Sequence, residues 1–303
     1  MKLLFNFFLF PGFLFSAIAG LLLGWIDRKV TARLQWRVGP PWHQNFTDII
    51  KLLGKETMLP VGANVMFLLY PYLGLIGLVL ATTILGNVVR SPLAGFSGDL
   101  IVMVYLLIIP ALAMILGASS SRNPLASVGA SREMKLLLAY ELPFILAIVA
   151  MIIKCGGAIQ LGTILDHQLR LGANLFSYSG FLSFIVAILC MQAKLCFVPF
   201  DASEADQELM GGVLIEYSGL PLAVFKLTKA VLLYTMPLFI IVLFWADNLS
   251  PLILIGKFIS LLVVIVLIKN TNPRLRIDQS LRFFWRIPTF LATLAVVLAT
   301  LGL

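Results

Sequence analysis

The sequence predicts an all-α, polytopic membrane protein with about eight transmembrane helices. Of its 303 residues, 60% are hydrophobic and only 12% are charged, and the mean hydropathy is +1.02. Soluble domains are about 45–50% apolar and about 25% charged, so this composition excludes a water-soluble globule. The apolar residues gather in long runs rather than in the alternating pattern of a β-barrel. A bundle of membrane-spanning helices is the fold class that fits.

About eight apolar runs have the length that a spanning helix needs, roughly 20 residues for a hydrocarbon core about 30 Å thick. Backbone polar groups must be satisfied within lipid, which favours helices. No internal repeat or low-complexity linker divides the chain, so we expect a single integral membrane domain over residues 1–303. The predicted spans are Leu3–Ile26, Asn64–Val89, Leu100–Ala118, Leu136–Ile153, Tyr178–Phe200, Gly212–Trp245, Leu249–Ile268 and Phe283–Leu303.

Lysine and arginine are distributed unevenly between the two sets of connections. The first, third and seventh connections hold most of them, whereas the opposite set holds only Arg90, Lys154 and Arg170. By the positive-inside rule the odd-numbered connections face the cytoplasm. We therefore expect a multi-pass protein of the inner (cytoplasmic) cell membrane with both termini on the outer side. The same asymmetry accounts for the net charge of +8, so no nucleic-acid partner is expected.

The first basic connection contains an amphipathic segment of its own. Its apolar residues recur with helical spacing, and its polar residues face the other way. Asn45 is a predicted N-cap, with Asp48 three residues further on. Such a helix suits either the membrane surface or the face of a soluble partner. The apolar positions are Phe46, Ile49, Ile50 and Leu53.

The fifth connection, PFDASEADQELMGG, breaks the basic rule because it has four carboxylates and no lysine or arginine. If the segment is helical, residues at i, i+3 and i+4 share one face. Carboxylates packed so closely repel one another, so some are expected to hold protons near neutral pH. A solvated acidic loop is the simpler interpretation. The four residues are Asp201, Glu204, Asp206 and Glu208.

Several ionisable residues fall inside predicted spans, where they cost several kcal/mol unless paired or hydrated. Glu141 lies within the fourth span, and Glu216 lies in an apolar stretch that Lys226 and Lys229 follow. Lys257 lies far enough from the ends of its span to be a candidate proton relay. Acids and lysines in separate spans can form a chain of proton-exchanging groups. Lys194, near a helix end, is interpreted as a snorkelling side chain.

The run Gly212–Trp245 exceeds one membrane crossing by about ten residues. Either it is strongly tilted or its first turns project into the cytoplasm. Pro221 and Pro237 are expected to kink it, which either opens a hydrated pocket or only adjusts packing.

The three cysteines indicate no metal or disulfide chemistry in this chain. Cys155, Cys190 and Cys196 lie in or beside apolar runs, and none forms a CxxC pair. We expect no catalytic residue, no metal site and no cofactor here, so any metal chemistry belongs to another polypeptide.

Four stretches together resemble a known family, the membrane subunit that anchors the hydrophilic arm in respiratory complex I. The resemblance covers nearly the whole chain in the same order, and the acidic loop followed by EYSG is its most specific part. The stretches are IDRKVTARLQWRVGPPWHQNFTDIIKLLGKETMLP, GASSSRNPLASVGASREMKLLLAYELP, PFDASEADQELMGGVLIEYSG and NPRLRIDQSLRFFWRIP.

Within that family the chain looks like the energy-converting (group 4, membrane-bound) nickel–iron hydrogenases. The motif Gly39-Pro40-Pro41, the IDRK opening and the FKLTK continuation carry this second likeness. It implies that ferredoxin or formate electrons reduce protons at a nickel–iron centre and that this drives proton or sodium export. The implied partners are soluble large and small hydrogenase subunits, a ferredoxin-like Fe–S subunit and antiporter-like membrane subunits. The nickel–iron centre and the Fe–S clusters would belong to those partners.

The resemblance also implies roles for individual residues. The acidic loop corresponds to the family's acidic loop that faces the hydrophilic module, Glu141 to its buried glutamate, and Glu216 and Tyr217 to its EYSG motif. We hypothesise that these groups couple redox turnover to ion movement. Lys226, Lys229 and Lys257, identified from their positions in the predicted spans, are further candidates. Two departures stand out. Asp27 and Asp206 occupy positions where the family commonly has Glu, and GGV before Leu214 removes one acid. The residues implied in partner docking are Arg28, Lys29, Arg33 and Arg37.

The functional hypothesis is a membrane-anchoring and coupling subunit of an energy-converting hydrogenase. The main alternative in the same family is the quinone-site membrane subunit of a complex I type NADH or ferredoxin:quinone oxidoreductase. A stand-alone secondary transporter predicts inverted sequence symmetry, which is not seen. A passive membrane anchor predicts that the buried acids can be neutralised without effect.

Overall fold

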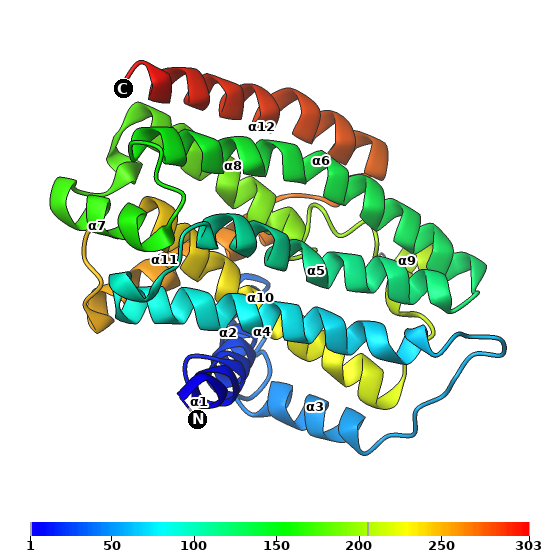
Figure 1. The fold of residues 1–303 in the computed structure, drawn as a ribbon. Helices are drawn as coiled ribbons and strands as arrows, with labels where there is room; N and C mark the ends of the chain where they lie inside the picture. The colour runs from blue at the N-terminus through cyan, green and yellow to red at the C-terminus, as the bar shows by residue number, and fades with distance from the viewer. Residues whose placement is uncertain (1, 205, 303) are drawn as a thin grey trace.

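The computed structural model describes residues 2–204 and 206–302, except for the side chains of residues 2, 3, 206 and 207, and within these limits it is helical with no β-strand. The all-α fold class is confirmed. Figure 1 shows long helices that run back and forth across the molecule. The long helices are α2 (Phe13–Leu34), α4 (Met66–Arg90), α5 (Asp99–Ser120), α6 (Pro124–Lys154), α8 (Tyr178–Lys194), α10 (Gly219–Phe244), α11 (Pro251–Thr271) and α12 (Ile277–Thr300).

Short helices lie before the first long helix and in the connections. They are α1 (Lys2–Phe8), α3 (Gln44–Leu53), α7 (Leu161–Leu171), α9 (Asp206–Leu209) and the 3₁₀ turns η1 (Pro92–Ala94), η2 (Asn174–Phe176) and η3 (Gly212–Leu214). In the described part of the chain, seven helical segments are long and apolar enough to cross a membrane, the first of them Leu4–Leu34 across α1 and α2, and α8 is a further apolar helix of 17 residues. This agrees with the eight predicted crossings and makes the chain a multi-pass membrane protein.

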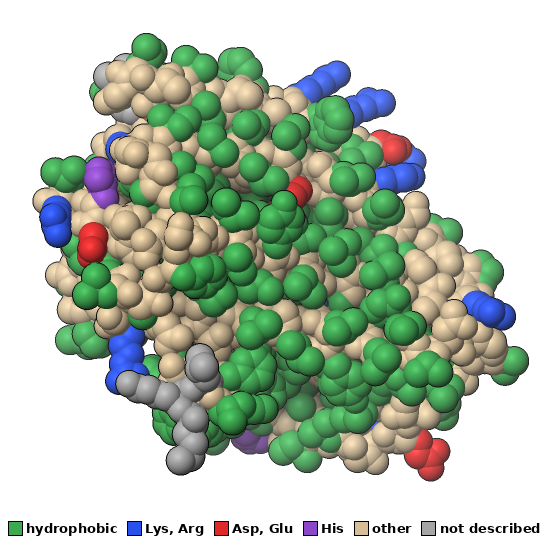
Figure 2. All heavy atoms as spheres, viewed as in Figure 1, with side chains coloured by type: hydrophobic (Ala, Val, Ile, Leu, Met, Phe, Trp, Pro, Cys, Tyr) green, Lys and Arg blue, Asp and Glu red, His purple; other side chains and the backbone are tan. Residues whose placement is uncertain are grey.

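The helices are arranged around α10, which is buried along most of its length. It packs against α2, α4, α8 and α11, while α6, α8 and α12 form a neighbouring group joined through α5 to α4. Gly20 allows α2 to approach α10 closely, because a side chain there would collide with the carbonyl of Ala230. In Figure 2 hydrophobic side chains cover much of the visible face, and most basic side chains seen there lie toward its edges.

The long helices alternate in direction, so every second connection lies at the same end of the bundle. These connections are residues 35–65, which include α3, and residues 121–123, 195–218 and 272–276. We call this end the basic end, since most lysines and arginines lie there. Hydrogen bonds join these connections across the sequence. Leu275 N–H donates to Pro199 O at 3.0 Å, and Met58 N–H donates to Ser218 Oγ at 2.9 Å. The basic end is therefore a packed layer rather than a set of free loops.

Several predicted boundaries were wrong. The run Gly212–Trp245 is not one helix, because η3 and the segment 215–218 precede α10, which begins at Gly219. Pro221 lies in the first turn of α10, where no intrahelical donor is needed, so it does not break the helix. The first run is divided between α1 and α2, and α8 ends at Lys194 instead of continuing to Phe200.

The amphipathic segment does form a helix, α3, with the predicted spacing of apolar residues. The N-cap prediction was wrong, since the helix begins after His43 and has no side-chain cap. Asn45 instead donates its Nδ2 hydrogen to Leu21 O at 2.8 Å and so fastens α3 to α2.

Candidate functional site

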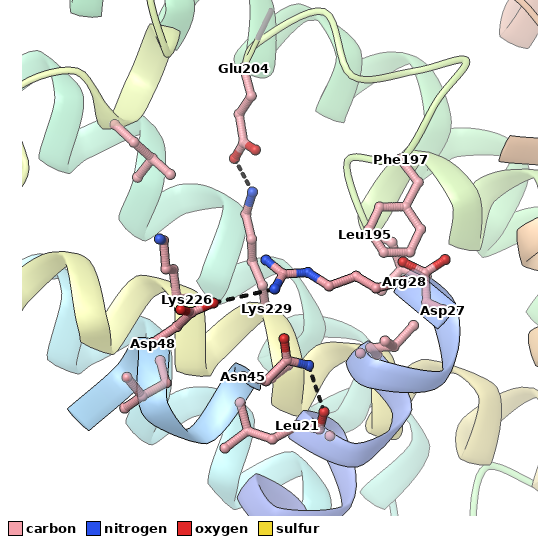
Figure 3. Close-up of a pocket in the computed structure, with 16 residues that line it drawn as sticks. Leu21, Asp27, Arg28, Asn45, Asp48, Leu195, Phe197, Glu204, Lys226 and Lys229 are labelled. Carbon is pink, nitrogen blue, oxygen red and sulfur yellow. Dashed lines mark hydrogen bonds and ion pairs between the residues drawn. The ribbon is translucent and has the colours of Figure 1, made fainter. Parts of the chain in front are cut away.

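The acidic segment 201–208 lies at the basic end and is held by cations from other helices. Asp201 Oδ2 accepts from Arg274 Nε at 2.8 Å, and Glu208 Oε2 accepts from Arg132 Nη1 at 2.6 Å. Glu204 forms an ion pair with Lys229 of α10 (Figure 3). Each of these three carboxylates thus has a basic partner, which offsets the mutual repulsion expected from the sequence.

The predicted shared helical face of Glu204 and Glu208 was wrong. Helix α9 contains only four residues, and Glu204 precedes it. The two side chains diverge, one toward α10 and the other toward α6. The side chain of Asp206, also predicted for this cluster, lies outside the part of the chain that the structure describes.

Glu133 is a buried acid that the predicted spans do not include. It lies on α6 with 0% of its surface exposed, and Cys196 Sγ lies 3.6 Å and 3.8 Å from its two carboxylate oxygens. The residue lies in a polar stretch, SREMK, and the predicted apolar span begins only at Leu136, so Glu133 is expected in the preceding loop. The available signal was its spacing, because Glu133 and Glu141 are eight residues apart and therefore lie on the same side of a helix.

Glu141 and Lys194 form an ion pair between α6 and α8. Lys194 Nζ lies 2.6 Å from Glu141 Oε2, and only 2% and 11% of the Lys194 and Glu141 side chains are exposed. The ammonium also lies 5.1 Å from the ring centroid of Tyr140 and 4.7 Å from that of Phe144. Such cation–π contacts stabilise a desolvated charge. The interpretation of Lys194 as a snorkelling side chain was wrong.

These acids and bases together form a set that we call the buried charge series, which runs from the partly exposed pair Glu204 and Lys229 at its outer end to the buried Glu133, Glu141 and Lys194. Glu133 and Glu141 are separated by about 12 Å along α6, from the rise of about 1.5 Å per residue. A cavity of about 10 Å³ is lined by both Lys229 and Lys194, together with Cys196. A space of this size is close to the minimum for one water molecule. The series leads from the basic end into the helix bundle.

The EYSG motif joins three parts of the basic end. Glu216 is half-buried and accepts a hydrogen bond from Asn123 Nδ2, while the Tyr217 ring stacks on Phe67 at 4.1 Å and its hydroxyl donates to Phe67 O at 3.2 Å. Burial raises the pKa of the Tyr217 phenol, which keeps this donor protonated. Because α10 begins at Gly219, Glu216 lies before this helix and not within a span. Its predicted position inside a span was wrong.

The two remaining predicted lysines do not join the buried charge series. Lys226 is exposed and lines the cavity described below. Lys257 is buried at the opposite end of the bundle, where it pairs with Asp247 and donates to Trp245 O at 2.8 Å. Its distance from the ends of α11 suggested a relay, but the connection 245–250 folds against its ammonium and anchors it.

The four basic residues predicted for docking lie on α2 and just beyond it. Arg28 forms an ion pair of 3.3 Å with Asp48, whereas Arg33 and Arg37 are exposed and Lys29 is half-buried. Large apolar side chains accompany them in the same connection at the basic end, with exposures of 59% to 102%. These are Trp36, Val38, Trp42, Met58 and Val61.

Beside the buried charge series, a cavity of about 320 Å³ opens between α2, α3, α10 and the segment 195–214 (Figure 3). Glu204 and Lys229 form part of its wall, and Asp27 lies on another side. The Asp27 side chain is 7% exposed and pairs with Lys269 of α11 at 2.8 Å. The cavity therefore combines apolar walls with several charged groups.

No group of three or more His, Cys, Asp or Glu side chains among the described residues is arranged to hold a metal ion. The three cysteines are buried and free of disulfides.

A multi-pass helical membrane protein with ionisable side chains in its interior is the class that this architecture defines. Residues 7–300 match the family described as NADH dehydrogenase, and the chain belongs to that family. It is 27% identical over 305 residues to the H subunit of NADH-quinone oxidoreductase from Bacillus cereus (strain B4264), an alignment that covers 93% of this chain and 90% of that protein. The corresponding protein of Bacillus thuringiensis (strain Al Hakam) gives the same identity and coverage.

A solved structure shows a similar fold. It is that of the membrane-bound sulfane sulfur reductase, an archaeal respiratory membrane complex, with a TM-score of 0.88 and 27% sequence identity over 99% of this chain and 100% of that one. The family resemblance drawn from the sequence motifs is thus confirmed, and this chain is similar to subunits of multisubunit respiratory membrane complexes.

Proposed function

We propose that this chain is the membrane-anchoring and coupling subunit of an energy-converting hydrogenase complex. In this role it links hydrogen-evolving redox chemistry in a soluble arm to the translocation of protons or sodium ions. The electrons come from ferredoxin or formate. The nickel–iron centre and the Fe–S clusters reside in partner subunits, and this chain performs no redox step itself.

The observation that carries the proposal is the buried charge series. Ionisable groups inside a membrane protein are costly and mark ion or proton pathways by default. Here the series begins at Glu204 and Lys229, beside a surface connection, and continues inward to Glu141 and Lys194. A change of charge or conformation at the acidic segment would alter the protonation of the buried acids, because like and opposite charges shift one another's pKa. Energy would then pass laterally to neighbouring membrane subunits.

Docking of a soluble arm is supported by the exposed residues of the first connection. Arg33 and Arg37 provide positive charge, and Trp36 is 98% exposed at the same end of the molecule. Aromatic and arginine side chains are enriched at protein interfaces. The partners we propose are the large and small hydrogenase subunits and a ferredoxin-like Fe–S subunit, with antiporter-like subunits within the membrane. In this arrangement the protein lies in the inner cell membrane, its basic end faces the cytoplasm, and both termini lie on the outer side.

The test is Glu141→Gln in the assembled complex, with hydrogen evolution and ion export measured in the same vesicles. Glutamine keeps the size of the side chain and removes its charge, so we expect hydrogen evolution to continue and the number of ions exported per hydrogen to fall. Glu56→Gln, at an exposed carboxylate of the basic end, is the matched control. Normal stoichiometry in the Glu141→Gln complex would refute the coupling role and favour a passive anchor.

Quinone reduction is a second candidate, and the 320 Å³ cavity beside Glu204 favours it. The relatives in Bacillus carry the name NADH-quinone oxidoreductase. The two candidate functions can be distinguished by supplying the purified complex with reduced ferredoxin, with and without a quinone, and measuring hydrogen and quinol. A hydrogenase evolves hydrogen without quinone, whereas a quinone reductase produces quinol and no hydrogen. Mass spectrometry of the native assembly would identify the partner subunits independently.

A further inference from the structure

A groove of about 420 Å³ lies between α6 and α12. Figure 1 shows these two helices on the side of the bundle away from α2 and α3. Lys135 and Leu138 line it from α6, and Arg282, Trp285 and Arg286 line it from α12. On α6 these residues are three apart, and on α12 the two arginines are four apart, so each set lies on one helical face. The groove therefore has two helical walls with three cations between them.

Within residues 2–204 and 206–302, these three cations have no acidic partner. At the same end of the bundle Arg132, Arg274 and Lys269 each pair with a carboxylate. Among the described residues, Lys135, Arg282 and Arg286 form no ion pair, and Asp278, one turn before Arg282, makes none with it. Like charges four residues apart on a helix destabilise it. An anion bound between the helices would relieve this repulsion.

The rest of the groove is apolar, which indicates that its occupant has a hydrocarbon part. Leu138 is 60% exposed and Trp285 is 65% exposed, although both lie beside the cations. Tryptophan is enriched where the headgroup region meets the hydrocarbon core. A free phosphate would require the cations alone, whereas a phospholipid uses both the cations and the apolar wall.

The depth of the groove agrees with the surface of a bilayer. From Lys135 to the end of α6 at Lys154 the helix spans roughly 28 Å, and from Arg282 to the end of α12 at Thr300 it spans roughly 27 Å. Both lengths match a hydrocarbon core of about 30 Å. Lys135 and Arg282 thus stand at headgroup level, and Arg286, one turn deeper, reaches the same level by extending its side chain.

We infer that this groove binds an anionic glycerophospholipid, with its phosphate held by Lys135, Arg282 and Arg286 and an acyl chain against Leu138 and Trp285. Basic pockets between transmembrane helices on the cytoplasmic side suit such headgroups. The site lies apart from the buried charge series, so it stands independently of the proposed coupling function.

The test places the purified complex in phosphatidylcholine nanodiscs with or without phosphatidylglycerol and counts bound phosphatidylglycerol by native mass spectrometry. The variant Lys135→Gln/Arg282→Gln/Arg286→Gln should lower the affinity roughly a hundred-fold, because each cation contributes about 1 kcal/mol near an anionic lipid. Arg282→Lys/Arg286→Lys keeps the charge and should retain binding, which controls for folding. Lys51→Gln/Lys55→Gln removes two exposed cations elsewhere at the basic end and should leave binding unchanged.

Three results would overturn the inference. The first is equal retention of phosphatidylglycerol by the triple variant and the wild type. The second is displacement of the lipid by inorganic phosphate alone, which would make the site a phosphate site. The third is a density map of the complex in which side chains of a neighbouring polypeptide fill the groove.

Discussion

Lys194 and Glu141 meet at 2.6 Å between α8 and α6, with only 2% and 11% of their side chains exposed. The free energy lost by removing two charges from water often exceeds the free energy gained from their attraction. Apolar residues of similar volume therefore often stabilise a protein as well as a buried ion pair, or better. Glu141 Oε1, moreover, has no hydrogen-bond partner within the described part of the chain. A purely structural role explains such an arrangement poorly, whereas a group that exchanges protons requires an available oxygen.

The pair predicts an asymmetric response to mutation. Lys194→Met leaves the Glu141 carboxylate buried and uncompensated, so we expect a loss of about 3–5 kcal/mol in the free energy of unfolding. The double variant Lys194→Met/Glu141→Leu removes both charges and should regain most of that stability while ion export remains uncoupled. Thermal unfolding of the detergent-solubilised complex measures the first effect, and vesicle transport measures the second. A single variant as stable as the wild type would show that the pair is not desolvated.

Glu133 provides a second, independent probe of the buried charge series. Glu133→Gln retains the shape of the side chain beside Cys196 and removes its charge, so hydrogen evolution should persist while the ions exported per hydrogen decrease. Cys196→Ala keeps the carboxylate and tests whether the thiol contact matters for coupling or only for packing. Unchanged stoichiometry with Glu133→Gln would remove this residue from the series.

The sequence predicted the helical class, the eight apolar helices and the location of the acidic segment, because these depend on composition and local periodicity. It did not predict which charges pair, since the partners are far apart in the chain. Lys269 and Asp27 are 242 residues apart, and Lys194 and Glu141 are 53 apart. Glu133 is buried with Cys196 of the segment 195–204 against its carboxylate, and no local pattern in the sequence predicts that contact. Burial of Lys194 likewise depends on the rings of α6 beside it.

The Glu204–Lys229 pair is more exposed, with 21% and 30% of the side chains accessible, and should contribute little to stability. We expect Glu204→Gln to change the free energy of unfolding by less than about 1 kcal/mol. Its effect on coupling should be larger, because it removes the acid at the start of the buried charge series. The exchange variant Glu204→Lys/Lys229→Glu restores one charge of each sign and should recover coupling at least in part. If Glu204→Gln and Glu56→Gln behave alike in the transport assay, the series does not begin at Glu204.

Gly219 fixes the start of α10 against the connection that follows α3. Its φ is +59°, and a Cβ there would lie 2.7 Å from the carbonyl oxygens of both Glu56 and Lys55. Gly219→Ala should therefore destabilise the protein by about 1–3 kcal/mol, through backbone strain and collision. Gly256→Ala is the control, because a Cβ at this position of α11 meets nothing within 4 Å and alanine favours a helix. The melting temperatures of the two variants are compared by thermal unfolding. Equal values would contradict the tight contact between Gly219 and the carbonyl oxygens of Lys55 and Glu56.

The proposed orientation in the membrane rests on the distribution of basic residues and can be tested by labelling. Val61 is 102% exposed at the basic end, and Leu171 is 76% exposed at the opposite end. The native cysteines are buried, so Val61→Cys and Leu171→Cys each introduce one accessible thiol. With intact cells, a membrane-impermeant maleimide should label only Leu171→Cys, and with inverted vesicles it should label Val61→Cys unless a soluble arm covers it. Stripping that arm should then expose Val61→Cys. Labelling of Val61→Cys in intact cells would place the basic end outside and reverse the direction in which charge enters the buried series.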